Sequence, residues 1–87
     1  MPAPALTDAV RAALTGHGVV PTEGETPESL RVRLNEVYLG EVRALRERQR
    51  GGEIPIADYA RHVDALRRRF PLLGLPLARW TVGGPTA

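Results

Sequence analysis

Apolar residues recur with the 3.6-residue period of an α-helix from Pro27 to about Arg50, which predicts one long helix. Thr26 is suited to cap its first turn, and Pro27 to the first helical position, where a missing N–H costs nothing. The main apolar stripe consists of Leu30, Leu34, Val37, Tyr38 and Leu45, with Val42 at its edge. Val32 and Leu39 fall almost opposite that stripe. The helix is therefore expected to present one wide apolar face and a second, smaller one.

Two shorter helices are predicted on either side of the long one, over residues 7–15 and 56–70. Thr7 is suited to cap the first and Gly16 to end it, while Pro71 ends the other because it lacks an N–H. Their apolar stripes are Leu6, Val10, Ala13 and Leu14 in the first helix, and Ile56, Tyr59, Ala60, Val63, Leu66 and Phe70 in the second. The intervening segment 16–26 is rich in Gly, Pro and Thr, which predicts a loop.

The glycine pair at positions 51–52 stops the long helix, because glycine accepts the left-handed turn that satisfies a helix C-terminus. The short connection that follows predicts an antiparallel helical hairpin, with Ile54 and Ile56 both packing back on it. The second arm of this hairpin is the shorter one. Leu30 and Leu34 are therefore left to be covered by the first helix, by the C-terminal segment or by a second chain.

Residues 71–80 hold four leucines and the only tryptophan, and Gly74 and Pro76 interrupt any regular helix. This pattern predicts an extended apolar arm with a short turn near its end. Two alternatives are open: the arm is an exposed interface, for which tryptophan and arginine are favoured anchors, or it folds back over the uncovered leucines. The predicted interface residues are Val32, Leu39, Leu72, Leu73, Leu75, Leu77, Arg79 and Trp80. A homodimer is expected because one hairpin cannot bury all of this surface.

The chain has 87 residues, which suits one small all-α domain over 1–87, with flexible tails at 1–5 and 81–87. It has no cysteine, so disulfides and thiol catalysis are excluded. No signal peptide or membrane-spanning run is recognisable. A cytoplasmic protein without membrane contact is therefore expected.

All twelve basic residues are arginine, and the net charge is +2. Arginines gather near the ends of the second and third helices, where they suit phosphate contacts with nucleic acid. The candidate contacts are Arg43, Arg46, Arg50, Arg67, Arg68 and Arg69. In an antiparallel hairpin the two clusters lie at opposite ends, and the helix dipole favours cations at both places in any case. A dimer would be needed to bring them together.

The remaining polar candidates do not assemble into a reactive site. Glu41 lies inside the apolar stripe and is either a buried base with a raised pKa or, more simply, an ordinary carboxylate that pairs with an arginine such as Arg48 or reaches out at the edge of the stripe. His17 and His62 are far apart in the sequence, and Ser29 lies in a first helical turn, where serine helps capping. No nucleophile–base–acid set, metal site or phosphate loop is recognisable, so we expect neither catalysis nor a cofactor.

Over residues 39–66 a leucine-spaced helix is followed by Gly-x-Ile, an acidic–aromatic pair and a second leucine-spaced helix. The residues are Leu39, Val42 and Leu45, then Gly52 and Ile54, then Asp58 and Tyr59, and finally Val63 and Leu66. This segment resembles the short C-terminal domain (SHOCT) family. It departs from that family by about one extra helical turn before Gly52 and by Pro55 in place of a Thr or Ser cap.

The SHOCT family has no common enzymatic activity, so the resemblance implies an interaction or oligomerisation module. The leading prediction is a small non-enzymatic adaptor or regulator that binds another protein. The alternative is a small basic nucleic-acid-binding protein that uses the arginine clusters on phosphates.

Overall fold

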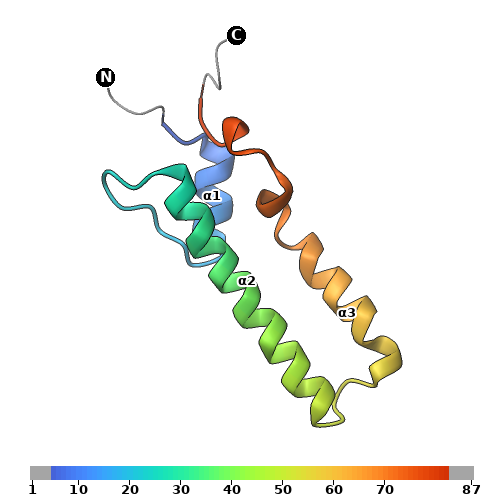
Figure 1. Cartoon of the computed structure of the whole chain (residues 1–87). Coiled ribbons are helices and arrows are strands. Elements are labelled where there is room, and N and C mark those ends of the chain that lie inside the picture. Colours follow the sequence, from blue (N-terminus) through green and yellow to red (C-terminus); the bar gives the residue numbers. More distant parts are fainter. Residues whose placement is uncertain (1–4, 83–87) are drawn as a thin grey trace.

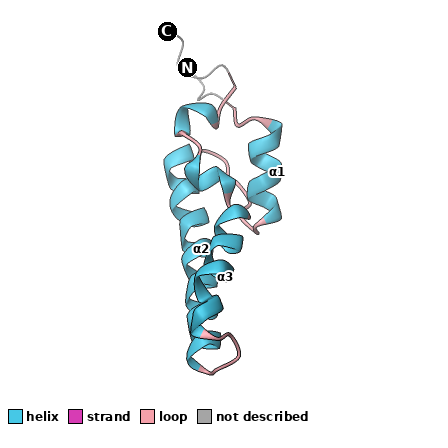
Figure 2. Ribbon diagram, turned by 90° about the vertical axis from the view of Figure 1, so that its right-hand side faces the viewer, coloured by secondary structure: helices cyan, strands magenta, loops and turns pink. Residues whose placement is uncertain are grey.

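The computed structural model describes residues 5–82 and is all-α, as predicted (Figure 1). Its elements are α1 (Asp8–Gly16), α2 (Pro27–Arg50), α3 (Ile56–Arg68) and the 3₁₀ turns η1 (Pro71–Gly74) and η2 (Leu77–Arg79). α2 and α3 form an antiparallel hairpin, and α1 packs beside it near the N-terminal end of α2 (Figures 1 and 2). The molecule is elongated, with extents of 53 × 25 × 17 Å. One end of the hairpin is therefore covered by other elements and the other end consists of two helices alone.

The bounds of α2 follow local rules. The Thr26 hydroxyl accepts the Ser29 N–H at 3.1 Å, and proline occupies the first turn. At the other end Gly52 has φ of +82°, and the N–H of Glu53 donates to the carbonyl of Arg48 at 2.9 Å. This is the Schellman arrangement, in which a left-handed residue lets the chain satisfy the last helical carbonyls. The predicted reversal at the glycine pair is confirmed.

The two glycines of this turn are expected to differ in their response to alanine. Gly52→Ala should lower the free energy of unfolding by about 1–2 kcal/mol, because a Cβ is unfavourable at positive φ. Gly51 has φ of −78°, so Gly51→Ala should leave stability unchanged or raise it by up to about 1 kcal/mol. Urea unfolding of the two variants measures both values. Equal losses would mean that the turn is not held in this conformation.

α1 starts as predicted, with the Thr7 hydroxyl accepting the Val10 N–H at 3.1 Å, but the residue that stops it is different. Gly16 is the last helical residue, and the left-handed residue is Gly18, with φ of +79°. The Val19 N–H then donates to the carbonyl of Leu14 at 2.9 Å. The side chains of Leu14 and Val19 are both buried. An apolar contact of this kind is typical of a Schellman turn, and it explains why Gly18 rather than Gly16 is the left-handed residue.

α3 is shorter than predicted, ending at Arg68, and Phe70 is buried just beyond it. The prediction that both isoleucines pack on the hairpin is half wrong. Ile54 is buried in the turn, where its N–H donates to the carbonyl of Arg48 at 3.3 Å. Ile56 is 78% exposed, because α3 starts there and turns its side chain outward.

The C-terminal arm is not extended. Its prolines precede or open two 3₁₀ turns, closed by hydrogen bonds such as Leu75 N–H to Leu72 carbonyl at 3.1 Å and Trp80 N–H to Leu77 carbonyl at 2.9 Å. These turns carry Trp80 back against the helices, where its side chain is fully buried. Of the two alternatives for the arm, the structure shows packing on its own chain.

The two ends of the described chain are joined by hydrogen bonds. The Thr7 N–H donates to the carbonyl of Trp80 at 3.0 Å, and the Val82 N–H donates to the carbonyl of Ala5 at 2.8 Å. Thr81 forms an isolated antiparallel bridge with Leu6 between them. These contacts hold residues that were predicted to belong to flexible tails. The rest of those tails, 1–4 and 83–87, lies outside the described residues.

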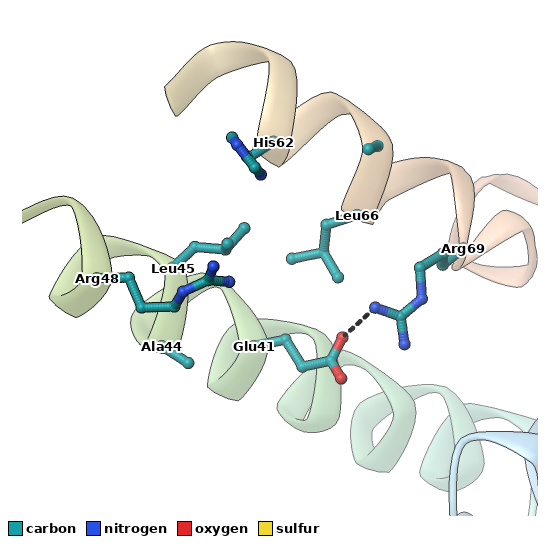
Figure 3. Close-up of a pocket in the computed structure, with 8 residues that line it drawn as sticks. Glu41, Ala44, Leu45, Arg48, His62, Leu66 and Arg69 are labelled. Carbon is teal, nitrogen blue, oxygen red and sulfur yellow. Dashed lines mark ion pairs between the residues drawn. The ribbon is translucent and has the colours of Figure 1, made fainter. Parts of the chain in front are cut away.

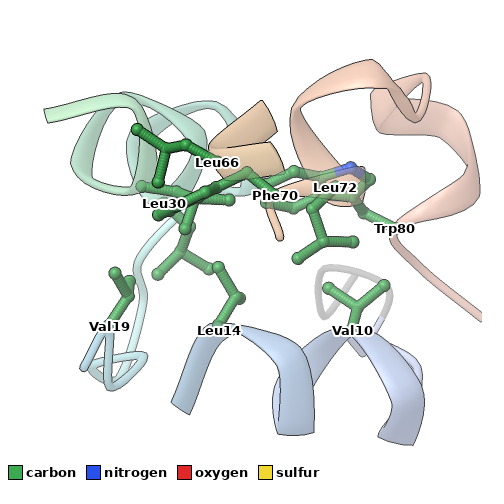
Figure 4. Close-up of a cluster of buried hydrophobic side chains, with 9 residues drawn as sticks. Val10, Leu14, Val19, Leu30, Leu66, Phe70, Leu72 and Trp80 are labelled. Atoms are coloured by element: carbon green, nitrogen blue, oxygen red, sulfur yellow. The ribbon is translucent and has the colours of Figure 1, made fainter. Parts of the chain in front are cut away.

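The core forms where α1, the start of α2, the end of α3 and the arm meet (Figure 4). Its members are Val10, Leu14, Val19, Leu30, Leu34, Leu66, Phe70, Leu72 and Trp80. Leu30 and Leu34 thus receive cover from the first helix and the arm together. Farther along the hairpin, Val42 and Leu45 are only partly buried. No helix in the described part of the chain is both long enough and apolar enough to cross a membrane.

Candidate interaction site

A groove of about 340 Å³ runs between α2 and α3 in the part of the hairpin that no other element covers (Figure 3). Its floor is apolar, and charged side chains stand on both of its sides. We call it the hairpin groove. It is lined by Glu41, Ala44, Leu45, Arg48, His62, Ala65, Leu66 and Arg69.

The hairpin groove continues the surface on which α1 packs. Leu66 belongs both to the buried core and to the lining of the groove. On α2 the groove-lining Glu41 and Leu45 follow Leu34 on the same side of the helix, because these positions share one face at 100° per residue. Beyond the end of α1 this face lies open. Val10 and Leu14 of α1 thus pack on a core made by α2, the end of α3 and the arm, and the groove adjoins this core at Leu66.

Glu41 pairs with an arginine, as the simpler of its two predicted roles requires, but the arginine is a different one. Its Oε2 lies 3.7 Å from Nη1 of Arg69, an ion pair too long to be a hydrogen bond (Figure 3). Arg48 pairs instead with Glu53, across the turn at the end of α2. The Glu41 side chain as a whole is 40% exposed, whereas its Oε2 atom is buried and accepts no hydrogen bond, so the ion pair with Arg69 is the contact that compensates this oxygen.

The arginines of the hairpin groove are paired but accessible to an acidic ligand. Arg69 pairs with Glu41 inside the groove, and Arg48 pairs with Glu53 beside it, so an acidic ligand would take the place of these partners. Arg48 and Arg69 are both at least half exposed, and guanidinium groups bind carboxylates in a planar, bidentate way. An apolar floor between such groups suits a ligand that is apolar on one side and acidic at its edge.

The predicted interface residues fall into two groups. Val32 and Leu39 are 63% and 36% exposed on the side of α2 away from the core. In the arm, Leu72 and Trp80 are buried within their own chain, so the prediction of an exposed interface is wrong for these two. Leu73, Leu75 and Leu77 are partly buried, and Arg79 is exposed. The apolar surface left for another molecule thus lies on the helices more than on the arm.

The predicted nucleic-acid contacts do not form a single surface. Arg50, Arg68 and Arg69 pair with Glu47, Asp64 and Glu41. Arg43, Arg46 and Arg67 make no ion pair within the described residues. Arg67 lines a separate hollow with Tyr38 and Phe70, away from the C-terminal end of α2. The hairpin keeps the two clusters apart, as its antiparallel arrangement predicts.

The histidines have separate environments. His17 stacks on Phe70, with ring centroids 4.0 Å apart and planes inclined by 17°, while His62 lines the hairpin groove. Within residues 5–82 no three histidine, aspartate or glutamate side chains are grouped so that they could hold a metal ion.

A polar cluster around Glu25 was not anticipated. Its carboxylate accepts hydrogen bonds from the Thr22 N–H at 3.2 Å, the Ser29 hydroxyl at 3.0 Å and Arg33 Nη1 at 2.7 Å. The Thr22 backbone donor, more than the hydroxyls or the guanidinium, lowers the pKa of Glu25 below its usual value. This cluster ties the loop before α2 to that helix. The spacing of Glu25 and Ser29, four residues apart, was the available signal for it.

Comparisons with protein-family models, with curated protein sequences and with solved structures found no match to this chain. The similarity to the SHOCT family therefore stays a prediction.

Proposed function

We propose that this chain is a small non-enzymatic interaction module that acts as an adaptor or regulator by binding another protein in the hairpin groove. The supporting observation is the groove itself, an open, apolar-floored continuation of the surface that α1 occupies. Two-helix surfaces of this kind bind amphipathic helices, whose apolar residues recur every three or four positions. The module requires no cofactor, and we expect it to act in the cytoplasm.

The chemistry of the groove defines the expected partner. Leu45 and Leu66 form a floor suited to leucine-sized side chains, and Ala44 and Ala65 leave room for a helix backbone to approach. The exposed guanidinium groups of Arg48 and Arg69 suit glutamate or aspartate next to the apolar stripe of the ligand, in exchange for their present partners Glu53 and Glu41. We therefore propose an amphipathic helix with an acidic flank as the bound element.

Ala65→Glu tests this proposal, because it adds an acid and bulk to the groove at an exposed helical position. The matched control is Ala57→Glu, which makes the same change at an exposed position of α3 that does not line the groove. We expect proteins captured by the tagged wild-type chain from native lysate to be captured by the control but lost with Ala65→Glu. Calorimetry on the captured protein should then show an affinity loss of about tenfold or more.

The proposal is contradicted if the wild type, Ala65→Glu and Ala57→Glu all capture the same proteins in equal amounts. That result would show that binding does not use the groove. Circular dichroism spectra of both variants must match the wild type, so that a lost partner is not confused with a lost fold.

Nucleic-acid binding is the alternative function, and its support is that Arg43, Arg46 and Arg67 have no ion pair within the described residues. If it holds, duplex DNA will shift in a gel with the chain, and the shift will weaken steeply as salt rises. Arg43→Ala would then reduce it. A shift of that kind would favour this alternative over the groove.

A further inference from the structure

The side of α2 that faces away from the core carries a continuous set of exposed residues, which we call the outer stripe. Its members are Glu28, Val32, Asn35, Glu36, Leu39, Arg43, Arg46 and Arg50. Val32 and Leu39 give it an apolar centre that no described element covers. The outer stripe does not share a residue with the hairpin groove.

Charge is divided along the outer stripe. Its acidic residues, Glu28 and Glu36, precede Leu39, and its three arginines follow it. The helix dipole explains acids in the first turn and bases in the last, but its effect fades within one turn. Glu36 and Arg43 lie in the interior of α2, so the dipole does not account for them.

These charges have few partners within the chain. Glu28, Glu36, Arg43 and Arg46 make no ion pair among the described residues. Arg50 approaches Glu47 only to 3.5 Å, and both side chains are largely exposed. The outer stripe therefore offers separate acidic and basic halves to another molecule.

The acidic half of one stripe is complementary in charge to the basic half of a second stripe that runs antiparallel to it, with Leu39 opposite Leu39. Glu28 and Arg50 are each eleven residues from it, and Val32 and Arg46 are each seven residues from it. In a second copy running antiparallel, Glu28 would face Arg50 of that copy, and Val32 would face the aliphatic stem of its Arg46. Leu39 would meet its own counterpart on the two-fold axis, as an isologous contact requires.

The outer stripe is open at its flanks as well as at its centre. Gly40 lies about 100° around α2 from Leu39, beside the stripe, and no described atom lies within 4 Å of the place that its Cβ would take. The two neighbours of Val32 donate hydrogen bonds away from the stripe: Arg31 Nη2 to the Leu73 carbonyl at 3.0 Å, and Arg33 Nη1 to the Val20 carbonyl at 3.1 Å. These bonds fix η1 on one side of the outer stripe and the loop before α2 on its other side, and Val32 stays exposed between them.

We propose that the chain forms a two-fold symmetric dimer in which the outer stripes of two α2 helices pack antiparallel, centred on Leu39. The occupant of this face is thus a second copy of the same chain, selected by its reversed charge pattern. The hairpin groove stays free in both copies. This inference goes beyond the proposed function and does not depend on it.

A charge exchange tests the dimer. One variant carries Glu28→Arg and Glu36→Arg, which makes both halves of its stripe basic. The other carries Arg43→Glu and Arg50→Glu, which gives the second half a net negative charge although Arg46 remains. Sedimentation equilibrium should show that each variant dimerises about tenfold or more weakly than the wild type, because like charges now face each other. An equimolar mixture should dimerise again as a heterodimer.

The control is Arg61→Glu with Arg68→Glu, which changes the net charge as much as the acidic variant does but on exposed positions of α3. It should dimerise like the wild type. Circular dichroism verifies that every variant is folded. A wild type that stays monomeric at roughly 1 mM would overturn the proposal, and so would two variants whose mixture does not associate. Ala65→Glu should dimerise like the wild type, because position 65 lies outside the outer stripe. The dimer proposal and the groove-binding proposal can therefore fail independently of each other.

Discussion

Replacing Trp80 by alanine is expected to lower the free energy of unfolding by about 3–5 kcal/mol, the largest single effect in this chain. The side chain is 0% exposed and lies in the core between α1, α2 and the arm (Figure 4). Its loss leaves a cavity and removes the donor that Nε1 supplies to the Leu75 carbonyl at 3.2 Å. A small domain is stable by only about 5–15 kcal/mol, so the variant should be close to unfolding at physiological temperature.

Urea unfolding followed by far-UV circular dichroism measures this loss. Trp80→Phe, which keeps an aromatic ring but not the indole N–H, should lose less. Val82→Ala removes an exposed side chain two residues later and should change stability by no more than about 0.5 kcal/mol. A loss below about 1 kcal/mol for Trp80→Ala would mean that the arm is peripheral to the fold, and that its packing over α1 is not what stabilises the chain.

The second large effect is expected at Leu34, whose truncation to alanine should cost about 2–5 kcal/mol. Leu34 is fully buried in the core cluster, where α1 and the arm cover it. Its neighbours in the core come from several elements that hold one another in place, so they fill the space left only in part, and the cost of a cavity adds to the lost burial. Thermal unfolding should register the loss as a fall in Tm of about 4–8 °C for each kcal/mol.

Leu39→Ala is the matched control, since it makes the same change in the same helix at a 36% exposed position. At low protein concentration it should alter the unfolding free energy by about 0.5 kcal/mol or less. Similar losses at both positions would contradict the assignment of the two faces of α2. A loss at Leu39 that grows with protein concentration would instead indicate association through the outer stripe.

The helices and their ends were predictable because the signals are local. Thr7 and Thr26 cap from within one turn, and Gly52 adopts its left-handed conformation where the apolar period stops. The periodicity of α2 predicted both its buried leucines and its exposed pair, Val32 and Leu39. Such features depend on residues only three or four positions apart, so they can be predicted from the sequence.

Choices between equivalent local signals were not predictable. Two glycines lie at the end of α1, Gly16 as its last residue and Gly18 just beyond it, and the burial of Val19 decides that Gly18 adopts positive φ. Two isoleucines flank Pro55, and only Ile54 is buried. In each case both candidates satisfy the same local rule, and the apolar space available in the folded chain selects one.

The candidate site was only partly contained in the sequence. Glu41 was recognisable as a carboxylate within an apolar stripe, and an arginine partner was expected for it. That the partner is Arg69, on the opposite arm of the hairpin, depends on the register between α2 and α3. The groove has the same origin, because its lining comes from two helices whose relative placement no periodicity specifies.

By itself, then, the sequence determined an all-α hairpin with its caps, its turn and the apolar faces of its helices, since helix formation and capping act over short distances. Only the tertiary structure decided where the arm goes. Leu72 and Trp80 could bury their side chains equally well against a partner or against their own chain. They are buried in their own chain because the apolar surface of Leu30 and Leu34 is available beside them. Burial of apolar surface is non-directional, so the order of residues alone cannot say which surface will cover another.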